Sequence, residues 1–157
     1  MKAKFSERKS VQEVEEGKIL QPKFDDNNLI PVITIDDSTK EVLMHGYMNP
    51  EALNSSLETG QAHYWSRSRQ CVWKKGETSG LKQIIRRILI DDDQDCLILS
   101  VELLGLKASC HVGYKSCFYR ELLSKDLKYT HNLEFTEKEK VFDPKEIYGD
   151  TPNPTKL

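Results

Sequence analysis

The sequence predicts a β-rich α+β fold, built as a single domain with one clear helix. Three observations lead to this prediction. The 157 residues are one ordinary domain's length, and their 38% hydrophobic content suffices for one modest core. Runs of strand length, several of them β-branched, recur along the chain, whereas a segment with both a helix cap and a helix stop occurs once. No internal repeat divides the chain further.

The first third of the chain predicts a short helix and then a hairpin. Residues 1–23 form a charged lead-in, with the helix expected around residues 11–20. A β-branched strand follows at residues 29–35, and a polar turn at 36–39 leads into a returning arm at 41–47.

The one clear helix is expected directly after this hairpin. Asn49 suits the N-cap, Pro50 the first helical position, and Gly60 the stop. Its apolar stripe consists of Ala52, Leu53 and Leu57.

The remaining strands are predicted at residues 62–65, 71–74, 83–90 and 97–103. Residues 116–122 could form a last strand or start a helix, and the polar tail from Ser124 is expected to be irregular at its end. The chain therefore divides into the lead-in 1–23, a domain at 24–123 and a polar extension at 124–157.

Charge and hydropathy exclude several classes of partner. The net charge of -2, from 23 basic and 25 acidic residues, gives no basic field for nucleic acid. No apolar run approaches the roughly 18 residues that a membrane helix needs, and the N-terminus lacks the apolar segment of a secretory signal. These features predict a cytoplasmic protein without disulfides. Its four cysteines are then buried apolar thiols or metal ligands.

Two clusters have the chemistry of metal sites. Asp91, Asp93 and Asp95 would share one face if the strand before them continues, and three adjacent carboxylates would suit Mg²⁺. A solvated acidic turn is the alternative. Cys110 and Cys117 enclose a histidine and Gly113, which would let the chain turn and bring two zinc-binding thiols together. Two core cysteines on one strand would explain that spacing almost as well.

A third group combines cations, hydroxyls and aromatic rings between residues 63 and 80. Arginine and lysine recognise phosphate, small residues can offer backbone N–H groups to an anion, and the rings could stack on a base. Its candidates for substrate binding are Trp65, Arg67, Arg69, Lys75, Thr78 and Ser79. A basic surface hairpin is the alternative for this segment. Taken with the two clusters, it indicates a nucleotide handled by metal ions.

These motifs resemble the phosphoribosyl-AMP cyclohydrolase family of histidine biosynthesis. The matching stretches are residues 29–31, 41–44, 47–49, 59–69, 73–80, 91–95 and 110–120. The resemblance implies a homodimeric α+β hydrolase that acts on a cyclic amidine and uses Zn²⁺ and Mg²⁺. Its reaction opens the adenine ring of 1-(5-phosphoribosyl)-AMP at the C6–N1 bond, giving the formimino-AICAR ribonucleotide without release of ammonia.

The resemblance also assigns the site residues. It implies that Asp91, Asp93 and Asp95 bind magnesium, and that Cys110 and Cys117 bind zinc in a site shared between subunits. His111 is the candidate for proton transfer and His63 the alternative. Either histidine could instead be a hydrogen-bonded core residue.

The chain departs from the family at the third zinc ligand, where the usual cysteine is replaced by Asp92. A carboxylate can bind zinc, so Asp92 is the simplest substitute. Cys96 would lie about 13 Å from position 92 in an extended strand, too far to take over without a shift of register. The 37 residues after Arg120 are too few for the pyrophosphohydrolase domain that many members carry, so only the cyclohydrolase activity is expected.

Two other functions remain open at this point. Another zinc-dependent nucleotide deaminase would share the metal chemistry but would release ammonia. A non-catalytic, zinc-stabilised binding module would keep the cysteines and would have no need of the three aspartates.

Overall fold

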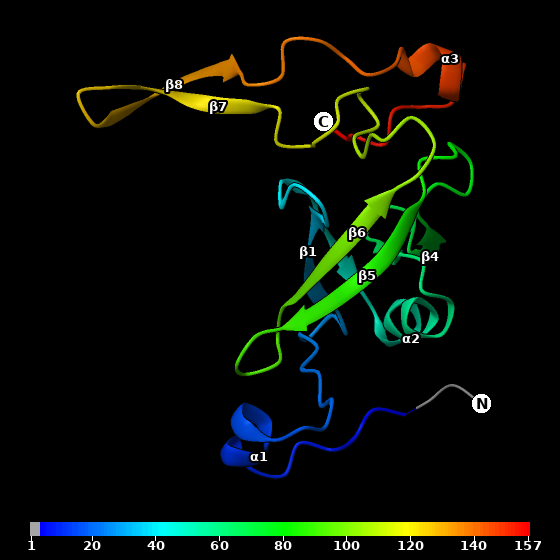
Figure 1. The fold of residues 1–157 in the computed structure, drawn as a ribbon, viewed down its shortest axis with the longest axis vertical. Helices are drawn as coiled ribbons and strands as arrows, with labels where there is room; N and C mark the ends of the chain where they lie inside the picture. The colour runs from blue at the N-terminus through cyan, green and yellow to red at the C-terminus, as the bar shows by residue number, and fades with distance from the viewer. Residues whose placement is uncertain (1–3) are drawn as a thin grey trace.

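The computed structural model describes residues 4–157 and has a four-stranded sheet at its centre (Figure 1). The sheet has the order β2-β1-β6-β5 and consists of β1 (Ile30–Asp36), β2 (Val42–Met48), β5 (Gln83–Ile90) and β6 (Leu97–Leu103). β1–β2 and β5–β6 are antiparallel hairpins, and their inner strands β1 and β6 pair in parallel. All four strands lie where the sequence predicts them to within one residue.

Helix α2 (Pro50–Thr59) confirms both predicted ends. The Asn49 side chain accepts the Ala52 N–H at 2.8 Å, and Gly60 takes the left-handed conformation with φ of +65°. The predicted apolar stripe is wrong at Leu57, which is 44% exposed. Ser56 is buried instead, because its hydroxyl oxygen accepts the His63 N–H at 2.9 Å and joins the helix to the next strand.

The core lies between the sheet and a second layer made of α2 and a two-stranded ribbon. The ribbon consists of β3 (His63–Ser66) and β4 (Cys71–Lys74), as predicted. Fully buried side chains from both layers include Ile30, Val32, Leu43, Met48, Leu53, Tyr64, Leu97 and Leu99. Among the described residues, no helix is long and apolar enough to cross a membrane.

The two terminal segments differ from the sequence prediction. Helix α1 (Val11–Glu16) is followed by its C-cap Gly17, so it ends four residues before the predicted end near residue 20. The C-terminal part forms a hairpin, β7 (Arg120–Lys125) and β8 (Lys128–Phe135), and then helix α3 (Pro144–Tyr148). Of the two alternatives for residues 116–122, the strand is found, but it begins only at Arg120. Its partner β8 was not expected, because nearly all residues of the hairpin are exposed and the sequence shows no alternation between a buried and a solvated face. The chain after α3 is irregular, as predicted.

The two candidate metal clusters lie at opposite ends of the molecule. Figure 1 shows α1 and the β5–β6 turn at one end of the long axis, and β7, β8 and α3 at the other. The acidic residues 91–95 form that β5–β6 turn, whereas Cys110 and Cys117 follow β6 at its far end. At about 3.3 Å per residue, the length of β6 alone separates them by roughly 20 Å.

Candidate functional site

Cys110 and Cys117 lie in an irregular loop, residues 104–119, between β6 and β7. Gly113 forms the predicted turn with φ of +107°, and its N–H donates to the Cys110 carbonyl at 3.1 Å. We call residues 110–117 the thiol loop. The Cys117 N–H donates to the Leu43 carbonyl of β2 at 2.7 Å, and this hydrogen bond fixes the C-terminal end of the thiol loop to the sheet. The loop excludes the alternative of two cysteines on one strand.

The Cys110 and Cys117 thiols lie next to each other and shift each other's pKa in opposite directions. A hydrogen bond from the Cys117 thiol lowers the pKa of Cys110 to about 6, against the opposite effect of burial. The same bond raises the pKa of Cys117, which stays protonated. Lys75 is buried beside the pair, where its ammonium donates to the Ser109 carbonyl at 2.6 Å and further favours the Cys110 thiolate. The sequence suggested phosphate binding for Lys75, but the structure places its ammonium in the interior.

His111 directly follows Cys110 in the same loop. Burial lowers the pKa of His111, a hydrogen bond with the Asn153 side chain opposes that shift, and the Lys75 ammonium adds to it. Its Nε2 atom is buried and has no hydrogen-bond partner among residues 4–157. The alternative His63 lies on β3, half-buried, with Nδ1 at 2.9 Å from the Gln61 carbonyl oxygen. The orphaned nitrogen therefore favours His111 for proton transfer.

A buried polar chain that the sequence did not reveal links the core to the thiol loop. The Tyr64 hydroxyl is 2.7 Å from the Thr34 hydroxyl and donates to the Gln83 side-chain oxygen at 2.6 Å. The Gln83 amide in turn donates to the Ser109 hydroxyl at 2.7 Å. Ser109 precedes Cys110 directly, so this chain holds one end of the thiol loop.

The acidic residues form a closed turn, so the prediction of a continuing extended strand is wrong. Asp91 closes the turn because its carboxylate accepts the N–H groups of Asp95 and Cys96, each at 2.9 Å. The carboxylates of Asp91, Asp93 and Asp95 still converge, with oxygens within 4.8 Å of one another. Partial burial and the charges of Asp93 and Asp91 raise the pKa of Asp95, the effect that a bound cation would relieve.

The closed turn also removes the argument that distance excludes Cys96. The Asp91 N–H donates to the Cys96 carbonyl at 3.2 Å, so the two residues face each other across the turn. Burial and the charges of Asp91 and Asp95 raise the pKa of the Cys96 thiol. Asp92 is exposed and does not belong to the group of converging carboxylates. Its exposure leaves it accessible to a second molecule.

The N-terminal lead-in packs against this acidic turn through Gln94. The Gln94 side-chain oxygen accepts the Gln21 N–H at 2.7 Å, and its amide donates to the Val14 carbonyl at 2.9 Å. Arg8 donates to the backbone carbonyl of Asp93 at 2.8 Å. The lead-in thus helps to shape the turn. These contacts could not be predicted from the sequence, because the partners lie more than 70 residues apart.

We expect Gln94→Ala to lower the free energy of unfolding by about 1–3 kcal/mol, because it leaves a buried N–H and a buried carbonyl without partners. Urea denaturation measures this loss. Gln70→Ala is a matched control, since Gln70 also has a positive φ and a side-chain hydrogen bond but is exposed. Equal losses in both variants would contradict the role assigned to Gln94.

The remaining substrate candidates lie on and after the β3–β4 ribbon. Arg67 and Arg69 are exposed in its turn, with their guanidinium carbons 4.3 Å from the Tyr47 ring centre and 5.8 Å from that of Trp73. Trp65 is half-buried on β3. After the ribbon, Thr78 is exposed and Ser79 accepts the Leu81 N–H at 3.2 Å. These cations and hydroxyls remain accessible to a phosphate, unlike Lys75.

The donor sets of both clusters fit the expected metals. Two adjacent thiols, of which Cys110 has its pKa lowered to about 6, are the soft ligands that zinc prefers. Three converging carboxylates are the hard oxygen ligands of Mg²⁺. No single cluster among the described residues joins a third cysteine, histidine or carboxylate to the thiol pair.

Comparisons with known proteins agree with these motifs. Residues 44–119 match the family model for phosphoribosyl-AMP cyclohydrolase. A phosphoribosyl-AMP cyclohydrolase of Methanoregula boonei is 50% identical over 133 residues, which cover 85% of this chain and 98% of that protein. One of Rhizobium leguminosarum bv. trifolii is 45% identical over 144 residues, covering 92% and 93%. A bifunctional histidine biosynthesis protein of Thermoanaerobacter pseudethanolicus is 51% identical over 126 residues, covering 80% of this chain and 54% of that protein.

Proposed function

The chain belongs to the phosphoribosyl-AMP cyclohydrolase family of histidine-pathway hydrolases, and from this premise we propose a reaction and the residues that perform it. The reaction is hydrolysis of the C6–N1 bond in the adenine ring of 1-(5-phosphoribosyl)-AMP. Cys110 and Cys117 hold zinc, and the acidic turn of Asp91, Asp93 and Asp95 holds Mg²⁺.

The observation that carries this proposal is the thiol pair with its buried lysine. Two neighbouring sulfurs beside the Lys75 ammonium, with the pKa of Cys110 lowered, favour a soft cation, and the unpartnered nitrogen of His111, the residue after Cys110, is available for a proton transfer. Neither the ammonium nor the orphaned nitrogen would be needed in a merely structural zinc site.

The incomplete zinc site supports the proposal of a homodimer. Zinc takes at least three protein ligands in catalytic sites, and the thiol pair supplies two. The acidic turn of the same chain is at the far end of β6, so a carboxylate from it reaches the thiols only from a second copy. We assign this ligand to Asp92, which is exposed. The half-buried Ile33 and Ile98 on the outer face of the sheet support such an association.

The substrate carries a second ribose phosphate on N1, which makes the ring cationic and C6 electrophilic. Zinc, when bound, acts as a Lewis acid that makes water a nucleophile near neutral pH. His111 takes the proton from the attacking water and returns it to N1 as the C6–N1 bond breaks. Arg67, Arg69 and the hydroxyls of Thr78 and Ser79 hold the phosphates, and Trp65 stacks on the base.

The reaction is tested by adding phosphoribosyl-AMP to the purified protein and following the ultraviolet change of ring opening. An ammonia assay on the same sample distinguishes the chemistry. Ring opening without ammonia is expected. Ammonia release would favour a nucleotide deaminase, and the absence of any spectral change would favour a non-catalytic zinc module.

Removing Mg²⁺ is expected to stop turnover reversibly while zinc stays bound, because oxygen-ligated Mg²⁺ exchanges faster than thiolate-held zinc. Asp93→Asn should reproduce this loss by removing one of three carboxylates. The rate at increasing Mg²⁺ and the zinc content after chelation are measured together. If Asp93→Asn keeps the wild-type rate and Mg²⁺ dependence, the acidic turn is only a solvated surface feature.

A further inference from the structure

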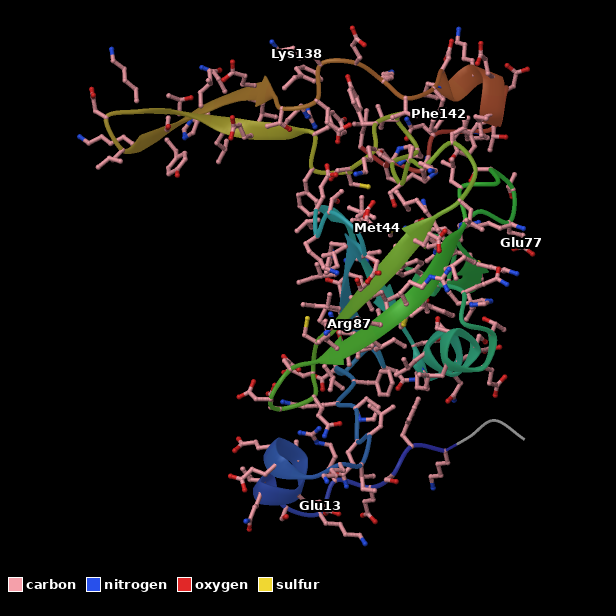
Figure 2. All side chains as sticks on the ribbon, in the orientation of Figure 1. Glu13, Met44, Glu77, Arg87, Lys138 and Phe142 are labelled. Carbon is pink, nitrogen blue, oxygen red and sulfur yellow. The ribbon has the colours of Figure 1, made fainter. Side chains whose placement is uncertain are left out.

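The chain segment after β8 lies along the thiol loop. It comprises residues 136–142 and falls outside residues 44–119, which match the family model. Figure 2 shows Lys138 and Phe142 of this segment at the same end of the molecule as the loop that follows β6. The sequence assigned no role to this part of the extension.

The Glu137 carboxylate accepts hydrogen bonds from two consecutive backbone amides of the thiol loop, one with each oxygen. Oε2 accepts the Lys115 N–H at 2.9 Å and Oε1 accepts the Ser116 N–H at 2.9 Å. Hydrogen bonds to an ionised carboxylate are about twice as strong as those between neutral groups. Both amides immediately precede Cys117, so these two hydrogen bonds set the direction of the backbone that leads into Cys117.

The other side of the same residues is fixed to the central sheet. The Ser116 hydroxyl donates to the Val42 carbonyl at 2.7 Å, and the Lys115 ammonium contacts the Glu41 carboxylate at 2.5 Å. Residues 115–117 are therefore held between β2 and Glu137. Because this loop is neither helix nor strand, no regular ladder would replace the contacts with Glu137.

Glu137 is itself held by anchors on both sides. Before it, the Thr136 N–H donates to the Tyr119 carbonyl at 2.9 Å. After it, the Val141 N–H donates to the Gly113 carbonyl at 2.7 Å, and Phe142 is buried against Leu81 and Ala108. The carboxylate is thus presented to the loop by a well-anchored segment.

We propose that Glu137 is a positioning residue that orients Cys117 for zinc. This inference rests on the proposed zinc site at Cys110 and Cys117. In Glu137→Gln the side-chain oxygen can still accept one N–H, but the amide nitrogen cannot accept the second. The variant therefore loses one of the two hydrogen bonds without changing the size of the side chain.

The test measures zinc release from the full-length, zinc-loaded protein to a chromophoric chelator. We expect release from Glu137→Gln to be roughly 10- to 100-fold faster than from wild type, the range found when partners of metal ligands are removed. The cobalt-substituted variant should show altered thiolate-to-cobalt absorption bands. Glu139→Gln is the matched control, because Glu139 is exposed in the same segment. It should match wild type in both measurements.

Amide hydrogen exchange on metal-free protein separates orientation of the loop from folding. Faster exchange at Lys115 and Ser116, with unchanged protection in β1 and β6, supports the proposal. Equal zinc release from zinc-loaded wild type and Glu137→Gln, or loss of protection throughout the sheet, would overturn this inference alone. A wild-type protein that binds no zinc would overturn the zinc site and the inference together.

Discussion

Replacing Cys117 with serine is expected to remove zinc and to reduce ring opening to background, because thiolates supply most of the affinity of such a site. The loss of zinc affinity should exceed that expected from the removal of one ligand. Without the Cys117 thiol, Cys110 loses the hydrogen bond that lowers its pKa to about 6, so it also becomes a weaker ligand near neutral pH. Cys110→Ser should have the same outcome. Zinc content and the ultraviolet assay are measured on the same preparations.

Cys71→Ser provides the control for this pair. Cys71 is half-buried on β4, outside the thiol loop, so its variant should keep zinc and rate close to those of wild type. Full activity with stoichiometric zinc in Cys117→Ser would refute the assignment of the zinc site. Loss of activity in Cys71→Ser alone would indicate that turnover depends on the β3–β4 ribbon and not on the thiol pair.

The central sheet and α2 could be predicted because their signals are local. The two hairpins have β-branched or apolar arms joined by polar turns, and α2 has its cap, its proline and its terminal glycine within 12 residues. The parallel pairing of β1 with β6 had no such signal, since it joins residues that lie 65 positions apart, such as Val32 and Leu97. The exposed β7–β8 hairpin lacked the alternation on which strand prediction depends.

The site could be predicted in its ligands but not in the groups that hold them. Cysteine spacing and repeated aspartates can be read directly from a sequence. The roles of Gln83, Gln94 and Glu137 cannot, because their hydrogen-bond partners lie in distant segments that only the fold brings close. The acidic cluster was found for a reason that proved wrong. Its carboxylates converge because Asp91 captures two backbone N–H groups and closes a turn, not because an extended strand alternates.

Asp92→Ala is expected to weaken zinc binding and the homodimer together, because Asp92 would bridge two copies of the chain. A ligand that binds only the assembled state shifts the equilibrium toward it, so zinc should stabilise the dimer of wild type and not that of the variant. Sedimentation velocity with and without zinc, alongside zinc content, measures both effects. Asp92→Cys should retain zinc or bind it more tightly through a softer ligand.

Cys96→Ser is the matching variant and should be nearly silent. Distance no longer excludes Cys96, because the closed turn brings it near Asp91, but its chemistry does. Burial and the adjacent carboxylates of Asp91 and Asp95 raise the pKa of its thiol, and zinc requires the thiolate. Asp92 is exposed at the same turn, and a carboxylate oxygen can bind zinc. Zinc lost in Cys96→Ser and kept in Asp92→Ala would show that the thiol, once freed by the partner's approach, is the third ligand.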